Sequence, residues 1–129
     1  MTVDVRPRAL FVDDDEMILR GVARYMLRIP EWETVFVLGG SEGLEAISSA
    51  RFDVVLSDFQ MPNVTGAELL LKVKLEHPST FRVLMTATPP PDYPRFAQAL
   101  LIKPFDFEEL RGVLNRVNEM TVEALVREP

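Results

Sequence analysis

Short apolar runs alternate along this chain with segments of helical periodicity, and this alternation is the feature that most constrains the fold. Each run is the length of a strand, and its predominantly apolar character is typical of strands buried on both faces. Strands that alternate with helices predict an α/β fold with a single doubly wound parallel sheet, helices on both faces and right-handed crossovers. The five runs are residues 8–12, 33–38, 52–57, 81–85 and 100–102.

The segments between the runs carry helix signals. Apolar residues recur at helical spacing over 18–29, and Pro30 is expected to end that helix. Ser41 is a candidate N-cap for the next helix. Residues 65–68 and 106–109 both have the spacing of a capping box, and the helix that starts at the second box is expected to run nearly to the chain end.

A proline-rich segment interrupts the alternation. Residues 89–94 contain four prolines at the point where a fourth helix is expected between the fourth and fifth strands. At most a short helix around Arg95 to Ala99 fits there. We therefore predict a shortened or irregular fourth helix.

Size and charge limit the possible functions. A length of 129 residues suits one domain, which we place at 8–120, between an N-terminal tail at 1–7 and a helical extension or linker at 121–129. No apolar run approaches the roughly 18 residues of a membrane span, so we expect a cytoplasmic protein without membrane contact. A net charge of −6 argues against direct nucleic-acid binding, and the absence of cysteine excludes disulfides and thiolate metal sites.

Polar residues follow four of the apolar runs at their C-terminal ends. Asp13 and Asp14 follow the first run, Asp58 the third, Thr86 the fourth and Lys103 the fifth. In an open parallel α/β sheet, ligands bind at the carboxyl ends of the strands. The topology therefore predicts that three carboxylates, one hydroxyl and one ammonium group share a single pocket.

The chemistry of these groups fits phosphoryl transfer. Neighbouring carboxylates repel one another unless a cation lies among them, and Mg²⁺ or Mn²⁺ prefers such oxygen ligands. Lys103 supplies a second positive charge, and Thr86 can donate a hydrogen bond to a phosphoryl oxygen. An aspartate that attacks phosphorus becomes an aspartyl phosphate.

Each of these residues also has a plainer interpretation. Taken alone, residues 13–15 read as a solvated turn, Asp58 as a turn residue, Thr86 as a strand-end hydroxyl and Lys103 as a surface lysine. The combination at four strand ends favours the joint site.

The candidate site residues lie in four stretches, Leu10–Asp15, Phe52–Gly66, Met85–Ala87 and Ile102–Phe105. In these stretches the chain resembles the receiver domain of two-component response regulators, the CheY-like superfamily, and the resemblance covers about residues 8–118. It implies a flavodoxin-like fold with strand order 2-1-3-4-5.

The resemblance also implies roles for individual residues. Asp58 would accept a phosphoryl group from a histidine kinase or a phosphotransfer protein in a Mg²⁺-dependent reaction. No enzymatic activity is expected beyond phosphorylation and dephosphorylation of the domain itself. The ion would be held by Asp13, Asp14, Asp58 and the backbone carbonyl of Gln60. The phosphoryl oxygens would be held by Thr86, Lys103 and the backbone of Ala87. The Lys103–Pro104 peptide would be cis.

Two departures from the family pattern concern the output. Leu100 occupies the position of the family's switch aromatic, so a tyrosine-type switch is absent. The shortened segment after Thr86 also removes part of the usual signalling face. Our hypothesis is that the domain keeps its phosphorylation chemistry, signals through a reshaped surface, and is a monomer or weak dimer. The sequence segments 30–33 and 67–70 resemble the corresponding segments of receivers that precede HD-type output domains.

Two other functions remain open from the sequence. The first is a receiver that is never phosphorylated and serves as a constant interaction module. The second is a haloacid-dehalogenase-like phosphatase, whose Asp-x-Asp pattern residues 13–15 superficially match. That alternative leaves Asp58 without a role, and turnover of a phosphate ester would distinguish it.

Overall fold

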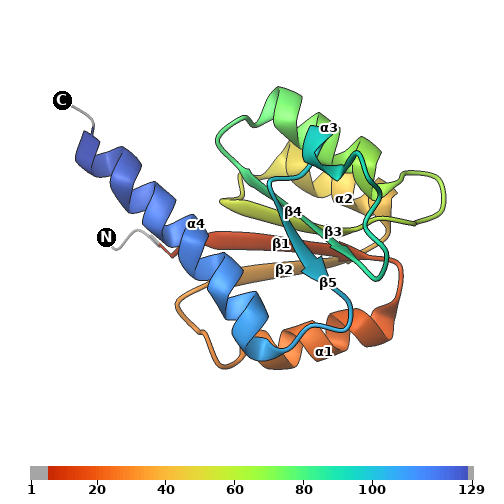
Figure 1. Ribbon diagram of the computed structural model, residues 1–129, viewed down its shortest axis with the longest axis horizontal. Coiled ribbons are helices and arrows are strands. Elements are labelled where there is room, and N and C mark those ends of the chain that lie inside the picture. The colour runs from red at the N-terminus through yellow and green to blue at the C-terminus, as the bar shows by residue number, and fades with distance from the viewer. Residues whose placement is uncertain (1–5, 128–129) are drawn as a thin grey trace.

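The five predicted strands form one parallel sheet of order β2-β1-β3-β4-β5 in a computed structural model that describes residues 6–127 (Figure 1). This confirms the doubly wound fold expected from the sequence. The elements in chain order are β1 (Arg8–Asp13), α1 (Glu16–Met26), β2 (Glu33–Leu38), α2 (Gly40–Ser49), β3 (Val54–Asp58), α3 (Gly66–Glu76), β4 (Phe81–Thr86), a 3₁₀ turn (Tyr93–Arg95), β5 (Ala99–Ile102) and α4 (Phe107–Arg127).

Helices cover both faces of the sheet and divide the core into two clusters. On β1, Phe11 faces the cluster built with α1 and α4, whereas Leu10 and Val12 face the cluster built with α2 and α3. Successive strand residues point to opposite faces, so a strand covered on both sides must be apolar throughout. Phe11 also stacks on Phe36 of β2, with ring centroids 5.3 Å apart.

The strand register brings the carboxyl ends of the central strands to the same edge of the sheet. Asp58 at the end of β3 pairs with Met85, and Thr86 at the end of β4 pairs with Ile102, the residue before Lys103. The polar residues that follow the strands therefore lie on one side of the domain. This is the arrangement from which the pocket was predicted.

Two helices start at the caps predicted from the sequence, and a third helix does not. Thr65 and Glu68 form the predicted capping box of α3, and Asp106 and Glu109 bond reciprocally in the same way at α4. Ser41 is not an N-cap, because α2 begins one residue earlier. Its N-cap is Gly39, whose positive φ of 99° makes the turn out of β2, and no side chain caps the helix.

Helix α1 is shorter than its apolar pattern predicts. It ends at Met26, and Arg28 N and Ile29 N close successive turns on Tyr25 O and Met26 O. Ile29 is nevertheless buried. The apolar spacing therefore correctly predicted the burial of Ile29 but overestimated the length of the helix.

The connection between β4 and β5 contains no α-helix. The short helix expected around Arg95 to Ala99 was placed too late in the sequence, since the only helical turn of this segment is Tyr93–Arg95 and Ala99 already pairs with Val83 in the sheet. Prolines occupy the preceding positions, where a helix would need backbone N–H groups. The predicted irregularity is confirmed, and only its position changes.

Helix α4 continues across the predicted boundary at residue 120 and ends at Arg127. Its C-terminal part projects beyond the edge of the sheet (Figure 1). Residues 1–5 of the predicted tail and 128–129 of the predicted extension lie outside the described residues. Within the described part of the chain, no helix is both long and apolar enough to cross a membrane.

Candidate functional site

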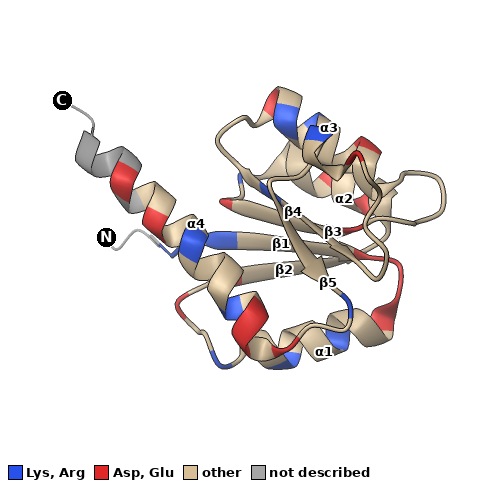
Figure 2. Ribbon diagram, in the orientation of Figure 1, with Lys and Arg blue, Asp and Glu red and all other residues tan. Residues whose placement is uncertain are grey.

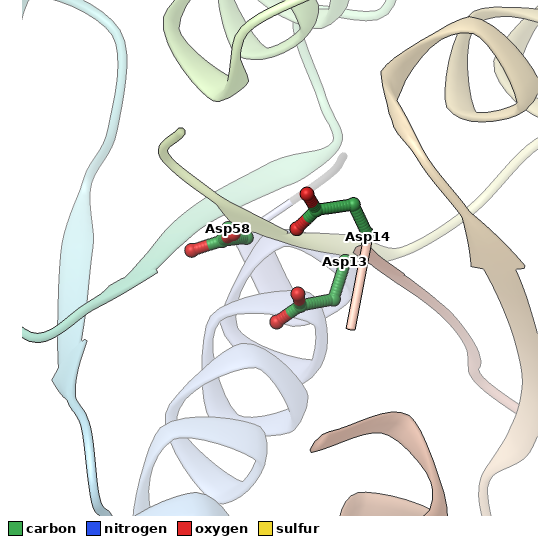
Figure 3. A group of neighbouring side chains, drawn as sticks. All are labelled: Asp13, Asp14 and Asp58. Atoms are coloured by element: carbon green, nitrogen blue, oxygen red, sulfur yellow. The ribbon is translucent and has the colours of Figure 1, made fainter. Parts of the chain in front are cut away.

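Three carboxylates lie together at the ends of β1 and β3. One carboxylate oxygen each from Asp13, Asp14 and Asp58 lies within 4.8 Å of the others (Figure 3). Asp13 is completely buried, Asp14 is exposed and Asp58 is half-buried. The connection from β1 into α1 is acidic throughout (Figure 2). The site thus combines buried and accessible negative charge at one edge of the sheet.

The ammonium group of Lys103 joins the two strands that carry these carboxylates. Lys103 Nζ lies 2.8 Å from Asp13 Oδ2 and 3.0 Å from Asp58 Oδ1. Burial by itself would lower the pKa of Lys103, but the hydrogen bonds and charges of the two aspartates outweigh it and the pKa is raised. Lys103 is therefore a firmly protonated cation beside Asp58.

The carboxylates in the β1–α1 connection have different roles. Asp13 Oδ1 accepts a hydrogen bond of 2.9 Å from Asp15 N, so both of its oxygens are bonded. Asp15 is the N-cap of α1, and its side chain accepts from Met17 N at 2.9 Å. Asp14 makes no hydrogen bond to any other residue described by the structure. Asp15 is thus a structural residue that caps α1, and Asp14 faces solvent.

The backbone at Asp58 is tightly held. Ser57 Oγ donates to Asp58 O at 2.9 Å, and Gly66 N donates to Phe59 O at 2.8 Å. A Cβ at Gly66 would collide with the carbonyl oxygen of Asp58. The Asp58 carboxylate is therefore presented from a rigid support.

The Asp58 side chain is shifted toward its protonated form. Burial raises the pKa of Asp58 above its ordinary 3.8. The hydrogen bond from Lys103 opposes this shift, and the negative charge of Asp13 adds to it. A cation bound among the three carboxylates would lower the pKa again, because it favours the charged form.

A cleft of about 310 Å³ opens beside Asp58. Thr86 is buried in its wall, and its hydroxyl donates to Thr88 O and accepts from Thr88 N, each at 3.3 Å. The lining residues are Asp58, Phe59, Gln60, Thr86, Ala87, Thr88 and Lys103. The structure thus brings together every predicted metal-binding and phosphoryl-binding residue except the switch position Leu100.

Leu100 lies in β5 and packs on the cluster between the sheet and α2 and α3, rather than in the cleft. Phe59 is the cleft residue that the sequence reasoning missed, although its position directly after Asp58 was an available signal. The Lys103–Pro104 peptide bond is cis, as the family resemblance implied.

The donor set fits a hard divalent cation. Three carboxylates at mutual oxygen distances within 4.8 Å are the oxygen ligands that Mg²⁺ or Mn²⁺ takes. Such an ion would be held by Asp13, Asp14 and Asp58, with the backbone of Gln60 in the adjoining cleft wall. Together with Lys103, it would make the cleft favourable for an anionic group.

Comparison with known proteins agrees with this geometry. A family model described as the response regulator receiver domain matches residues 9–115. The DNA-binding transcriptional regulator NtrC of Escherichia coli K12 is 34% identical over 112 residues, which make up 83% of this chain and 24% of NtrC. The chain therefore spans about a quarter of the length of that relative.

Solved structures show the same fold. The signal receiver domain of an HD domain-containing protein from Pseudomonas fluorescens Pf-5 has a TM-score of 0.85 and 28% identity, covering 99% of this chain and 98% of that one. The response regulator TrrA of Thermotoga maritima, in complex with Mg(2+)-BeF, has a TM-score of 0.73 and 26% identity, covering 86% of this chain and 98% of that one. The chain belongs to the response regulator receiver domain family of two-component systems.

Proposed function

We propose that this domain is a phosphoacceptor: Asp58 accepts a phosphoryl group from a histidine kinase or phosphotransfer protein, and the added charge switches partner interactions. The observation that carries the proposal is the position of the Asp58 carboxylate. It lies in an open cleft, 3.0 Å from Lys103 Nζ and within 4.8 Å of oxygens of Asp13 and Asp14. Positive and negative groups are arranged there around a nucleophile.

In the proposed reaction, a carboxylate oxygen of ionised Asp58 attacks phosphorus while the bond from phosphorus to the donor's imidazole nitrogen breaks. The electron pair of that bond stays on the imidazole, which takes up a proton. Lys103 neutralises charge on the transferred group, and the Thr86 hydroxyl can exchange its bond to Thr88 for one to a phosphoryl oxygen. The rigid backbone between Asp58 and Gly66 keeps the nucleophile in position.

We propose Mg²⁺ or Mn²⁺ as the ion of the site. When bound, the ion would supply charge neutralisation for the carboxylates and the phosphoryl oxygens. The acidic cluster supports this assignment, as does the Mg(2+)-BeF complex of the similar receiver TrrA. We expect no turnover of a separate substrate, because the accepted group stays on Asp58 until it is hydrolysed.

The output is proposed to lie outside this domain. The chain spans about a quarter of the length of NtrC, which is named as a DNA-binding transcriptional regulator. The similar structure from P. fluorescens is the signal receiver domain of an HD domain-containing protein. We propose that a C-terminal output domain, of HD type, follows α4 in the full-length protein.

The test is the intact mass of the protein after incubation with acetyl phosphate and Mg²⁺. We expect one phosphoryl adduct on the wild type and none on Asp58→Ala or without the ion. Asp53→Ala is the matched control, since that aspartate directly precedes β3 and so lies at the opposite end of the strand from Asp58. An absent adduct with every donor, including a phosphohistidine protein, would contradict the proposal and favour a constant interaction module.

A further inference from the structure

The connection from β2 to α2 contacts both sides of the candidate metal site, although it supplies none of the expected ligands. Gly39 N donates a hydrogen bond of 3.0 Å to the backbone carbonyl of Asp13, at the end of β1. Gly40, the first residue of α2, is buried against Val64 in the connection from β3 to α3. The sheet order explains this position, because α2 follows the edge strand β2 and crosses β1 to reach β3. Two adjacent glycines therefore lie between the acidic end of β1 and the loop that follows Asp58.

The contact between Gly40 and Val64 leaves no room for a side chain at position 40. A Cβ on Gly40 would collide with the carbonyl oxygen of Val64 and would lie 2.7 Å from the Val64 Cβ. The two backbones can approach this closely only because residue 40 is glycine. A backbone carbonyl cannot move aside as the end of a flexible side chain can. Any larger residue at position 40 must therefore push the loop away from α2.

Val64 also closes a turn with an unfavourable backbone conformation. Its N–H donates to Pro62 O at 2.8 Å across Asn63, which has a φ of 70°. A turn of this kind, with a positive φ at its central residue, is the rarer form of γ-turn and is strained for a residue with a side chain. Within the described chain, the Asn63 side chain makes no hydrogen bond that would offset the strain. Such a conformation persists only where the surrounding structure fixes it, and the contact with Gly40 does so.

The turn determines the path of the loop that contains Gln60. Gly66 N donates to Phe59 O at 2.8 Å, which fixes the two ends of the loop. Residues 60–65 belong to no strand or helix, and Gln60 lines the cleft beside Asp58. The direction of the Gln60 carbonyl therefore depends on the turn that follows it. A displacement of that turn would move the backbone oxygen that is expected to bind the ion.

We propose that the Gly39–Gly40 pair positions the metal site, by holding the backbone of Asp13 on one side and, through Val64, the loop that carries Gln60 on the other. This inference rests on the proposed function, because it concerns the ion that the phosphoacceptor reaction needs. Gly39 and Gly40 are positioning residues, since they act on the ion only through other residues. Changes to groups that orient metal ligands typically cost about 10–100-fold in metal affinity.

The test is direct titration of the whole chain with Mn²⁺, with the free ion counted by electron paramagnetic resonance, so that no phosphorylation is required. Gly40→Ala should bind Mn²⁺ about tenfold or more weakly than the wild type. Gly43→Ala is the matched control in the same helix, because its Cβ would meet side chains of Leu69 and Val12 instead of the loop backbone. It should keep the wild-type affinity within about twofold. Binding that persists in Asp14→Asn is subtracted as nonspecific.

Asn63 provides a second test in case Gly40→Ala does not fold. Asn63→Gly and Asn63→Val both remove the amide side chain, but only glycine adopts the positive φ without strain. We expect Asn63→Gly to bind Mn²⁺ as tightly as the wild type, and Asn63→Val to bind it about fivefold or more weakly. The comparison separates the conformation of the turn from the chemistry of the side chain.

Three outcomes would overturn this inference alone. They are wild-type Mn²⁺ affinity in folded Gly40→Ala, an equal loss of affinity in Gly43→Ala, and equal affinities of the two Asn63 variants. Each of them leaves the proposed phosphorylation of Asp58 intact. Failure of the wild type to bind Mn²⁺ would overturn the metal site of the proposed function together with this inference.

Discussion

The connection that follows β3 and the connection that follows β4 each join two neighbouring parallel strands, but they differ in structure. From Asp58 to Gly66, backbone hydrogen bonds and a capping box lead directly into an eleven-residue helix. From Thr86 to Ala99, the described chain has only a three-residue 3₁₀ turn. Backbone hydrogen bonds occur within both connections, but the second is held in addition by side chains of other elements, since Arg82 Nε donates to Phe96 O and Lys74 Nζ donates to Arg95 O.

This difference shows which parts of the domain are free to change. The proposed chemistry depends on strand ends, and the parallel register positions those ends whatever the length of the crossover. Thr86 and Lys103 therefore reach the cleft even though the helix between their strands is missing. The surface formed by the crossover is not constrained in this way.

The largest expected effect is in the first connection. Gly66→Ala should lower the free energy of unfolding by about 3 kcal/mol or more, because its Cβ would collide with the carbonyl oxygen of Asp58. Gly112→Ala is the control, since a Cβ there meets nothing within 4 Å, and it should stabilise α4 by about 0.5–1 kcal/mol. Urea unfolding measures both. Equal values for the two variants would contradict the rigid-support model.

The next effect tests the electrostatics of the first connection. Asp58→Asn should raise the unfolding midpoint at neutral pH by roughly 4 °C, because it removes a buried negative charge beside Asp13. Thermal unfolding from pH 3 to 8 measures the difference from the wild type. A lower midpoint for the variant at neutral pH would show that the bond to Lys103 outweighs burial.

The pH dependence follows from the sign of the shift. The Asp58 pKa is raised on folding, so the native state binds more protons than the unfolded state between the ordinary value of 3.8 and the raised value. Wild-type stability contributed by this group is therefore lost as the pH rises through that window. The advantage of the Asn variant should be full above the window and should vanish below about pH 3.8.

A smaller effect distinguishes a real helix cap from an apparent one. Thr65→Ala should cost about 1 kcal/mol, because Thr65 Oγ1 accepts from Glu68 N at the start of α3. Ser41→Ala should change stability by less than about 0.5 kcal/mol, since Ser41 lies inside α2 and caps nothing. Chemical denaturation of both variants measures the difference. A similar loss for Ser41→Ala would restore the cap expected from the sequence.

The smallest effect is expected in β5, the strand to which the second connection leads. Leu100→Tyr restores the family's aromatic at the switch position, but Leu100 packs away from the cleft. We expect the adduct yield with acetyl phosphate to change by less than about twofold. A large gain in that yield, or in affinity for a phosphorylation-dependent partner, would show that the tyrosine-type switch still operates.

The sheet and most of the site were predictable because they depend on local patterns and on topology. Apolar runs of strand length predict the strands, and strand order follows from the family resemblance. Asp13, Asp58, Thr86 and Lys103 each follow a run, so their convergence required only parallel pairing. The Thr65 capping box was equally local, because its two partners lie three residues apart.

The errors arose where a longer-range contact decides the conformation. Ser41 had the right residue type for a cap, but the turn at Gly39 starts α2 before it. The short helix was predicted too far along the chain, because Ala99 pairs with Val83 of β4 and therefore belongs to β5. Ile29 satisfied the helical period but lies in the turn after α1.

The sequence by itself determined that chemical groups suited to phosphoryl transfer follow the strands of an α/β sheet, because residue type and strand position are local properties. Only the tertiary structure decided that Lys103 bridges Asp13 and Asp58, that Asp15 caps a helix, and that Phe59 stacks on Phe96. Lys103 is separated from its partners by 90 and 45 residues. Contacts at such separations depend on how the helices and turns pack, which no single segment of sequence specifies.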